Sequence, residues 1–212
     1  MHRSSKKYLG DDAMKIQNLT EKSSIYTSNV YLITGTWNTL DDQNTLIDVG
    51  RDPSIIGMIR TASSGVGKHK LDQVILTHSH YDHASLLPEI REAFQPVVYA
   101  FSDYLKGVDR VLRGGEHLIA GDRSFEVIHT PGHSQDSICL YCEEDGALFA
   151  GDTPLVIRTP GGTYEEGFID ALKEICQKDV RTIYFGHGLP FIHDCNQLLR
   201  TSLRNVQGSH SK

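Results

Sequence analysis

The chain of 212 residues lacks long apolar runs, and no stretch approaches the ~18 consecutive apolar residues that a membrane helix needs. Its first thirteen residues are polar and charged, without the apolar core of a secretory signal peptide. We therefore expect a cytoplasmic protein without a membrane partner. Residues 1–13 are expected to be a disordered extension, because the first strand-like pattern begins at Met14.

Positive charge is also scarce. Lys and Arg number 21 against 27 Asp and Glu, which gives a formal net charge of -6 at pH 7. A surface that binds nucleic acid must neutralise phosphates and needs the opposite sign. Nucleic acid is therefore not expected as a partner.

Cysteine is sparse, and its four positions show no zinc-knuckle spacing. Cys139 and Cys142 lie in an alternating strand pattern, and Cys176 and Cys195 lie far apart. We expect buried, reduced thiols, which is the common state of free cysteine.

What the chain does contain is an alternation of strand and helix patterns without repeats or linkers. Segments rich in β-branched and aromatic residues predict strands, and they lie at 25–33, 45–49, 73–77, 97–101, 125–129, 137–142, 147–150 and 182–185. Helices are predicted between them, at 53–62, 85–94, 164–177 and 194–206. This order favours a layered α/β fold with helices outside the sheets, in a single domain over residues 14–212.

One short segment carries most of the chemistry. The apolar strand that ends at Thr77 runs directly into His78-Ser79-His80-Tyr81-Asp82-His83, which holds three imidazoles and a carboxylate in six residues. Alternation in an extended turn points His78 and His80 the same way, while Asp82 and His83 fall at the start of the next helix. This pattern predicts a metal site, with room for two ions rather than one.

Three further ligand-type residues each follow a predicted strand and a glycine. They are His133, Asp152 and His187. With the first cluster they make seven ligands, five imidazoles and two carboxylates, which suffices for two ions with a water between them. Such ions would lower the pKa of water to about 7 and so favour hydrolysis, with Asp82 as the candidate to orient the water and transfer a proton.

The HxHxDH motif, followed by His133, Asp152 and His187 in that order, resembles the signature of metallo-β-lactamase superfamily hydrolases of the glyoxalase II-like, dinuclear type. The resemblance implies a four-layer αββα sandwich with the metals at one edge. It also implies that His78, His80 and His133 bind one ion, that Asp82, His83 and His187 bind the other, and that Asp152 bridges them. Asp48, in a segment that resembles the family's DxG strand end, would support a ligating histidine. Zn²⁺ is the expected metal, with iron or manganese as alternatives.

The function implied is a metal-dependent hydrolase in which metal-bound hydroxide attacks a small ester, thioester or lactone. Thr153–Arg158 lacks the GRxD stretch of glyoxalase II and of persulfide dioxygenases, so the substrate class stays open. The alternatives are a mononuclear or diiron redox enzyme of the same fold and a phosphodiesterase or nuclease. Few residues follow His187, so we expect the loops at 153–164 and 134–137 to recognise a small-molecule substrate. The substrate-binding residues and the roles of His129 and His193 are left open.

Overall fold

The computed structural model describes residues 14–208, so the predicted disordered extension at residues 1–13 lies outside the described residues. The described chain forms two β-sheets. The first has the strand order β1-β2-β3-β4-β5-β6. Its strands are Lys15–Asn18 (β1), Tyr31–Thr34 (β2), Thr45–Ile47 (β3), Gln73–Ile75 (β4), Val97–Ala100 (β5) and Arg110–Val111 (β6). β1, β2 and β3 pair antiparallel, whereas β3 to β6 pair parallel, so β3, β4 and β5 all end at the same edge.

The second sheet has the order β11-β10-β9-β8-β7. Its strands are His117–Ala120 (β7), Arg123–His129 (β8), Ile138–Cys142 (β9), Ala147–Gly151 (β10) and Thr182–Phe185 (β11). Neighbouring strands pair antiparallel except β10 and β11, which are parallel. The turn between β9 and β10 contains Gly146 at a φ of 56°, the positive value that its predicted hairpin requires.

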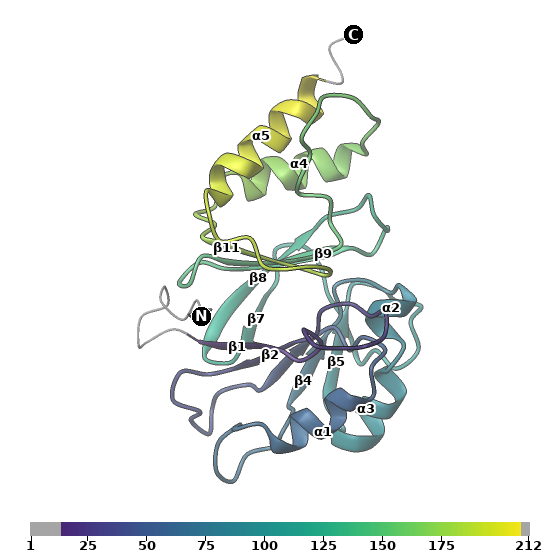
Figure 1. Ribbon diagram of the computed structural model, residues 1–212, viewed down its shortest axis with the longest axis vertical. Helices are drawn as coiled ribbons and strands as arrows, with labels where there is room; N and C mark the ends of the chain where they lie inside the picture. The colour runs from purple at the N-terminus through teal and green to yellow at the C-terminus, as the bar shows by residue number, and fades with distance from the viewer. Residues whose placement is uncertain (1–13, 209–212) are drawn as a thin grey trace.

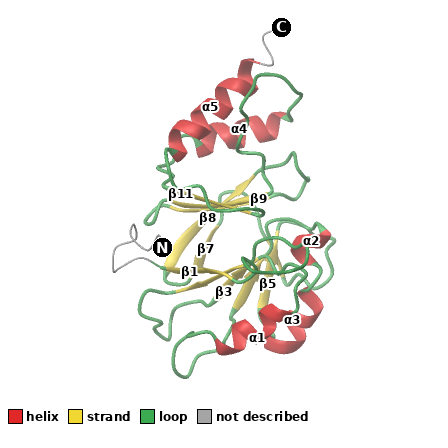
Figure 2. Ribbon diagram, in the orientation of Figure 1, coloured by secondary structure: helices red, strands yellow, loops and turns green. Residues whose placement is uncertain are grey.

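Five helices of the described chain cover the outer faces of the two sheets (Figures 1 and 2). Ser54–Thr61 (α1), Tyr81–Ala84 (α2) and Leu87–Phe94 (α3) lie on the side of the first sheet, and Glu166–Ile175 (α4) and Cys195–Gly208 (α5) lie beyond the second. The layers are therefore helix, sheet, sheet and helix, as the resemblance implied.

Apolar clusters fill the three seams between these layers. One joins the first sheet to α1 and α3 and includes Leu46, Val74 and Ile90. A second lies between the sheets, around Phe125 and Phe149. The third joins the second sheet to α4 and α5. Because apolar burial stabilises each seam, the helices hold both sheets in place and fix the ends of their strands.

Two sequence predictions were wrong in their details. The strand expected at 25–33 begins only at Tyr31, and the exposed residues Ile25 and Tyr26 belong to a loop. The helix expected at 85–94 begins at Leu87 and is preceded by the separate four-residue α2.

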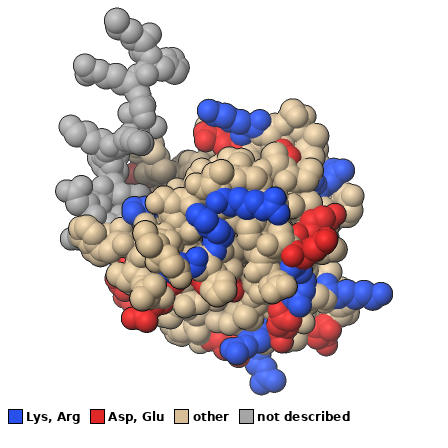
Figure 3. Space-filling view, turned by 90° about the horizontal axis from the view of Figure 1, so that it is seen from below, with Lys and Arg blue, Asp and Glu red and all other residues tan. Residues whose placement is uncertain are grey.

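The surface is mixed in charge where Figure 3 shows it. On this face, the lower end of the molecule in Figure 1, Lys and Arg side chains are interspersed with Asp and Glu.

The four cysteines are unpaired, and all but the half-buried Cys176 are buried. Among residues 14–208, no helix combines the length and hydropathy that a membrane crossing requires.

Candidate metal centre

The predicted ligands lie where strands of both sheets end. His78 follows β4, His133 follows β8, Asp152 follows β10 and His187 follows β11. The sheets are joined at this edge by a hydrogen bond from the backbone N of Ile138 to the carbonyl of Thr77, 2.9 Å long. Loops from four strand ends therefore converge on one place, and the structure brings all seven predicted residues together.

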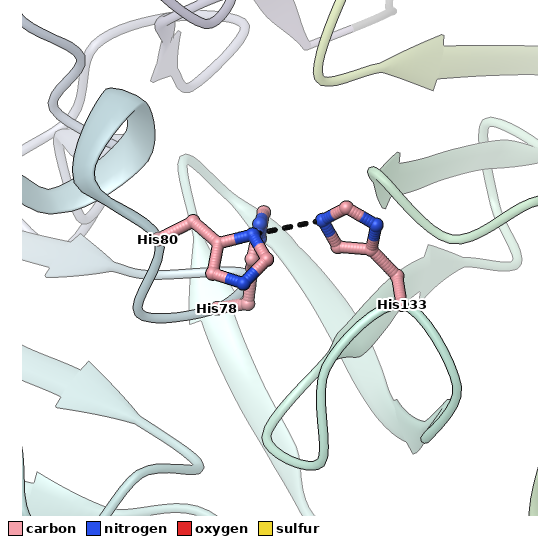
Figure 4. Close-up of side chains that lie close together, drawn as sticks. All are labelled: His78, His80 and His133. Carbon is pink, nitrogen blue, oxygen red and sulfur yellow. Dashed lines mark hydrogen bonds between the residues drawn. The ribbon is translucent and has the colours of Figure 1, made fainter.

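The first group consists of His78, His80 and His133, each of which offers a nitrogen within 4.8 Å of the others. His80 and His133 point toward each other, and Nδ1 of His80 lies 2.9 Å from Nε2 of His133 (Figure 4). His78 is buried, and its ring centre lies 4.6 Å from that of His80. Three imidazoles in this arrangement could hold one tetrahedral ion with a fourth position left for water or substrate.

The second group consists of Asp82, His83 and His187, again within 4.8 Å of one another. Asp82 Oδ2 lies 3.0 Å from His187 Nε2 and 3.9 Å from His83 Nε2. The short helix α2 places Asp82 and His83 side by side, as the motif predicted, and the end of β11 supplies His187. A second ion could be held by these three side chains.

Asp152 lies between the two groups. Its Oδ1 is 3.4 Å from His83 Nε2, and its Oδ2 is 3.6 Å from His133 Nε2 and 3.5 Å from His187 Nε2. One carboxylate thus faces histidines of both groups, which is the position a bridging ligand needs.

The orientation of His83 is set by Asp48. Oδ2 of Asp48 lies 2.8 Å from Nδ1 of His83, and both side chains are almost fully buried. The backbone N and the hydroxyl of Thr77 also donate to Asp48. A carboxylate on Nδ1 keeps the proton there and turns Nε2 toward the site, which is the usual arrangement behind a metal-binding histidine.

Burial and neighbouring charges shift the pKa values of the cluster's titratable groups in different directions. Desolvation, with help from the charge of His83, lowers the pKa of His78 to about 4. Desolvation also disfavours the charged form of His83. The interactions of His83 with Asp48 and Asp152 outweigh this desolvation and raise the pKa of His83 to about 10. For Asp152, burial favours the neutral form, yet the interaction with the nearby His83 prevails and holds the pKa of Asp152 at about 2. Asp152 is therefore ionised at neutral pH, as a carboxylate ligand must be.

The glycines that precede two of the ligands allow very close approach. A Cβ on Gly186 would lie 2.2 Å from Asp152 Oδ1 and 2.7 Å from His83 Cε1. A Cβ on Gly151, whose φ is +49°, would lie 2.6 Å from the hydroxyl of Thr77. In the sequence a glycine precedes each of these two ligands because the site leaves no space for a side chain at that position.

The donor set fits divalent metal ions. Nε2 of His78 and Nε2 of His83 are buried, and neither has a hydrogen-bond partner among the described residues. Buried polar atoms are rarely left unsatisfied, and a role in binding an ion is one of the recognised explanations. Imidazole nitrogens with carboxylate oxygens suit zinc, and they also suit iron and manganese.

A cleft of about 370 Å³ opens beside the site, lined by His133, Asp152, His187, Phe185 and the segment 151–156. The far end of that segment is fixed to α5, because the backbone N of Ile157 donates to Ser202 Oγ over 2.9 Å and Asn205 donates to the carbonyl of Ile157 over 2.7 Å. One wall of the cleft is therefore anchored rather than free.

The structure shows what surrounds His129 and His193, the two histidines whose roles the sequence left open. His129 stacks on Phe101 with ring centres 3.9 Å apart, and its Nε2 lies 2.8 Å from the carbonyl of Gln135. It therefore supports the turn that carries His133. His193 is exposed before α5 and belongs to none of the ligand groups found in the described chain.

Sequence reasoning missed two residues of the loop at 25–30. Tyr26 stacks on His187. Asn29 donates through its side-chain amide to the carbonyls of Phe185 and Gly188, on both sides of His187. Both contacts join residues more than 150 positions apart, so no local pattern could have revealed them.

The chain is similar to several known proteins. The sequence profile of the metallo-beta-lactamase superfamily matches residues 25–107 and 100–187. An atrochrysone carboxyl ACP thioesterase from Aspergillus fumigatus is 27% identical over 85% of this chain and 62% of its own length. A hydroxyacylglutathione hydrolase from Bartonella tribocorum is 31% identical over 55% of this chain and 49% of its own length. The chain thus spans about half to three-fifths of these curated relatives.

Solved structures share the fold. A metallo-beta-lactamase family protein from Thermus thermophilus superposes with a TM-score of 0.64 over 92% of this chain and 79% of its own, at 20% identity.

Proposed function

This chain belongs to the metallo-beta-lactamase superfamily, and on that premise we propose that it is a metal-dependent hydrolase of thioesters. The observation that carries the proposal is the convergence of two ligand groups with Asp152 between them. We assign His78, His80 and His133 to one ion, Asp82, His83 and His187 to the other, and Asp152 to both. The relatives named as thioesterase and hydroxyacylglutathione hydrolase support thioesters over the other esters that the sequence left open.

Two divalent ions held there would supply a water of lowered pKa and an electrophile for the thioester carbonyl oxygen. The chain's own residues then orient and transfer the proton. Asp82 is ionised, since the charges of His83 and His187 outweigh its partial burial and lower its pKa. Its carboxylate can accept the proton of the attacking water as the new C–O bond forms. When the C–S bond breaks, Asp82 can return that proton to the sulfur, and the products are an acid and a thiol.

Recognition of the substrate falls to the loops around the cleft. The segment 153–156 and Phe185 offer it an apolar side, whereas His133 and His187 face it from the metal centre. Within the described chain, no charged side chain other than the predicted ligands lines this cleft. We therefore expect several small activated thioesters to be accepted, with weak binding of each.

The proposal is tested with one acyl group presented as a thioester, an oxygen ester, a lactone and a phosphodiester. We expect the thioester to be hydrolysed fastest, the rate to vanish after chelation, and Zn²⁺ to restore it. His133→Ala should lower kcat/KM by at least about 10²-fold, because it removes a ligand. The matched control is His117→Ala, an exposed histidine on β7, which should stay within about twofold.

Three results would contradict the proposal: turnover that survives chelation, turnover that survives His133→Ala, or preference for the phosphodiester. Metal analysis of the purified protein separates the redox alternative. Iron together with oxygen consumption would favour that alternative, whereas zinc excludes it.

A further inference from the structure

Tyr26 lies on the candidate metal centre without belonging to its ligand set. The residue is in the loop between β1 and β2, and its side chain is 69% exposed. Its ring stacks on the imidazole of His187 with centres 5.4 Å apart and planes inclined by 14°. A large aromatic side chain that packs on a single imidazole and stays open to solvent contributes little to a hydrophobic core. Its position calls for another explanation.

The loop holds Tyr26 firmly although the side chain is exposed. Arg51 donates from its guanidinium to the carbonyl of Tyr26 over 3.2 Å and from its backbone N to Thr27 Oγ1 over 2.8 Å. The backbone N of Ser28 donates to the carbonyl of Asp82 over 3.1 Å. The loop is thus tied directly to the helix that carries Asp82, so the phenol is positioned before any ligand binds.

The imidazole on which Tyr26 packs lies next to a second member of the same group. Nε2 of His187 is 3.0 Å from Oδ2 of Asp82, and the loop that carries Tyr26 is bonded to the backbone of Asp82 through Ser28. The negative charge of Asp82 is also the largest of the causes that raise the pKa of Tyr26.

His187 differs from His78 and His83, the two buried histidines of the ligand groups, in how its ring is held. Nδ1 of His83 is fixed by Asp48, and Nδ1 of His78 lies 3.1 Å from the hydroxyl of Thr77. Among residues 14–208, no hydrogen bond holds the ring of His187 in this way. The stack with Tyr26 is then what restricts rotation of this imidazole from its outer face.

We propose that Tyr26 is a positioning residue for the group Asp82, His83 and His187: its ring, packed on the outer face of His187, sets the plane of that imidazole. The inference rests on the proposed function only for its effect on turnover. Its effect on metal affinity stands on the ligand geometry alone. Groups that orient ligands from outside typically contribute 10- to 100-fold to affinity or activity.

The test separates the ring from the hydroxyl. Tyr26→Leu removes the stack on His187, whereas Tyr26→Phe keeps the stack and loses only the hydroxyl. The matched control is Tyr104, which is also 69% exposed and contacts the hydroxyl of Ser79 rather than a predicted ligand. Zn²⁺ is titrated into metal-free protein against a chromophoric chelator, and the absorption of the Co²⁺-loaded protein reports ligand geometry.

We expect Tyr26→Leu to weaken the binding of one of two equivalents by about tenfold and to change the Co²⁺ spectrum. Tyr26→Phe keeps the stacked ring, so its binding of both equivalents, its Co²⁺ spectrum and its kcat should all stay close to those of the unaltered protein, within about twofold. Tyr104→Leu and Tyr104→Phe should stay within about twofold in every measurement.

Equal binding of both equivalents by Tyr26→Leu, with an unaltered Co²⁺ spectrum, would overturn the proposal. If that variant also unfolds more readily without metal, Tyr26→Phe decides, because a tenfold loss of metal binding in a variant that keeps the ring would contradict the role of the stack. A protein that binds two ions but hydrolyses no thioester would refute the proposed function, while the titrations would still judge Tyr26.

Discussion

Replacing Asp48 by Asn should leave the fold standing and damage metal binding. Asp48 adopts a φ of 58°, and Asn is among the residues that tolerate this left-handed conformation. The backbone N of Thr77 donates to Oδ1 over 2.8 Å, so the amide oxygen of the variant should take that place. The amide nitrogen then stands where Oδ2 lies, 2.8 Å from Nδ1 of His83.

That exchange reverses the hydrogen bond to His83. An amide NH₂ can only donate, so Nδ1 of His83 must accept and the ring proton moves to Nε2, the nitrogen that faces Asp152. A protonated Nε2 cannot bind metal. Loss of such a partner typically costs 10- to 100-fold in metal affinity, or about 1.4 to 2.7 kcal/mol. The free energy of unfolding should fall by only about 1 to 2 kcal/mol, the difference between a charged and a neutral hydrogen bond.

The assay is a Zn²⁺ titration of metal-free protein, paired with denaturant unfolding. Asp42→Asn is the matched control, since Asp42 is also buried and accepts from the backbone N and hydroxyl of Thr39, but belongs to none of the ligand groups. The control should lose some stability and keep metal affinity. If Asp48→Asn binds both equivalents as tightly as the unaltered protein, Asp48 does not orient His83 for metal, and the reasoning is refuted.

Three further predictions follow from the same centre. Asp82→Asn should lower kcat by at least about 10²-fold at full metal occupancy, measured by steady-state thioester hydrolysis, and near-normal turnover would mean that Asp82 is only scaffolding. Gly186→Ala should displace Asp152 or His83. It should lower the unfolding free energy by about 1 to 3 kcal/mol and weaken metal binding. Gly57→Ala is its control, since nothing lies within 4 Å of the added methyl and the unfolding free energy should hold or rise. Chelation should leave the far-UV circular dichroism unchanged, because apolar seams hold the layers, while the melting temperature falls with the loss of bound ions; a collapse of the dichroism would show that metal holds the fold.

Much of the fold was predictable because its elements carry their own signals. Val74 and Ile75 of the buried strand β4 are apolar and lie just before the ligand motif, and Gly146 marks a hairpin turn. The loop at 25–30 was mistaken for a strand because Ile25 and Tyr26 favour extended structure locally. Their exposure and the bonds that fix the loop depend on residues far along the chain, which outweigh propensity.

The candidate site, like the fold, was predictable where the signals are local in sequence and not where they depend on distant residues. The clustering of the motif residues with His133, Asp152 and His187 was expected from strand ends, since loops at one edge of layered sheets converge. The support of a ligating histidine by Asp48 came from the family resemblance and not from spacing. The structure identifies that histidine as His83, 35 positions away. The contact of Tyr26 with His187 had no signal in either, because it depends on how two loops from different sheets meet.

Anomalous diffraction from crystals of metal-replete protein tests the central claim most directly, since it locates each ion against the side chains. The account predicts two peaks per chain, about 3.5 Å apart, the spacing typical of two-metal hydrolytic sites. One peak should lie among His78, His80 and His133, the other among Asp82, His83 and His187, with Asp152 in contact with both. A single peak that leaves one of these groups empty, or ions bound elsewhere in the chain, would contradict it.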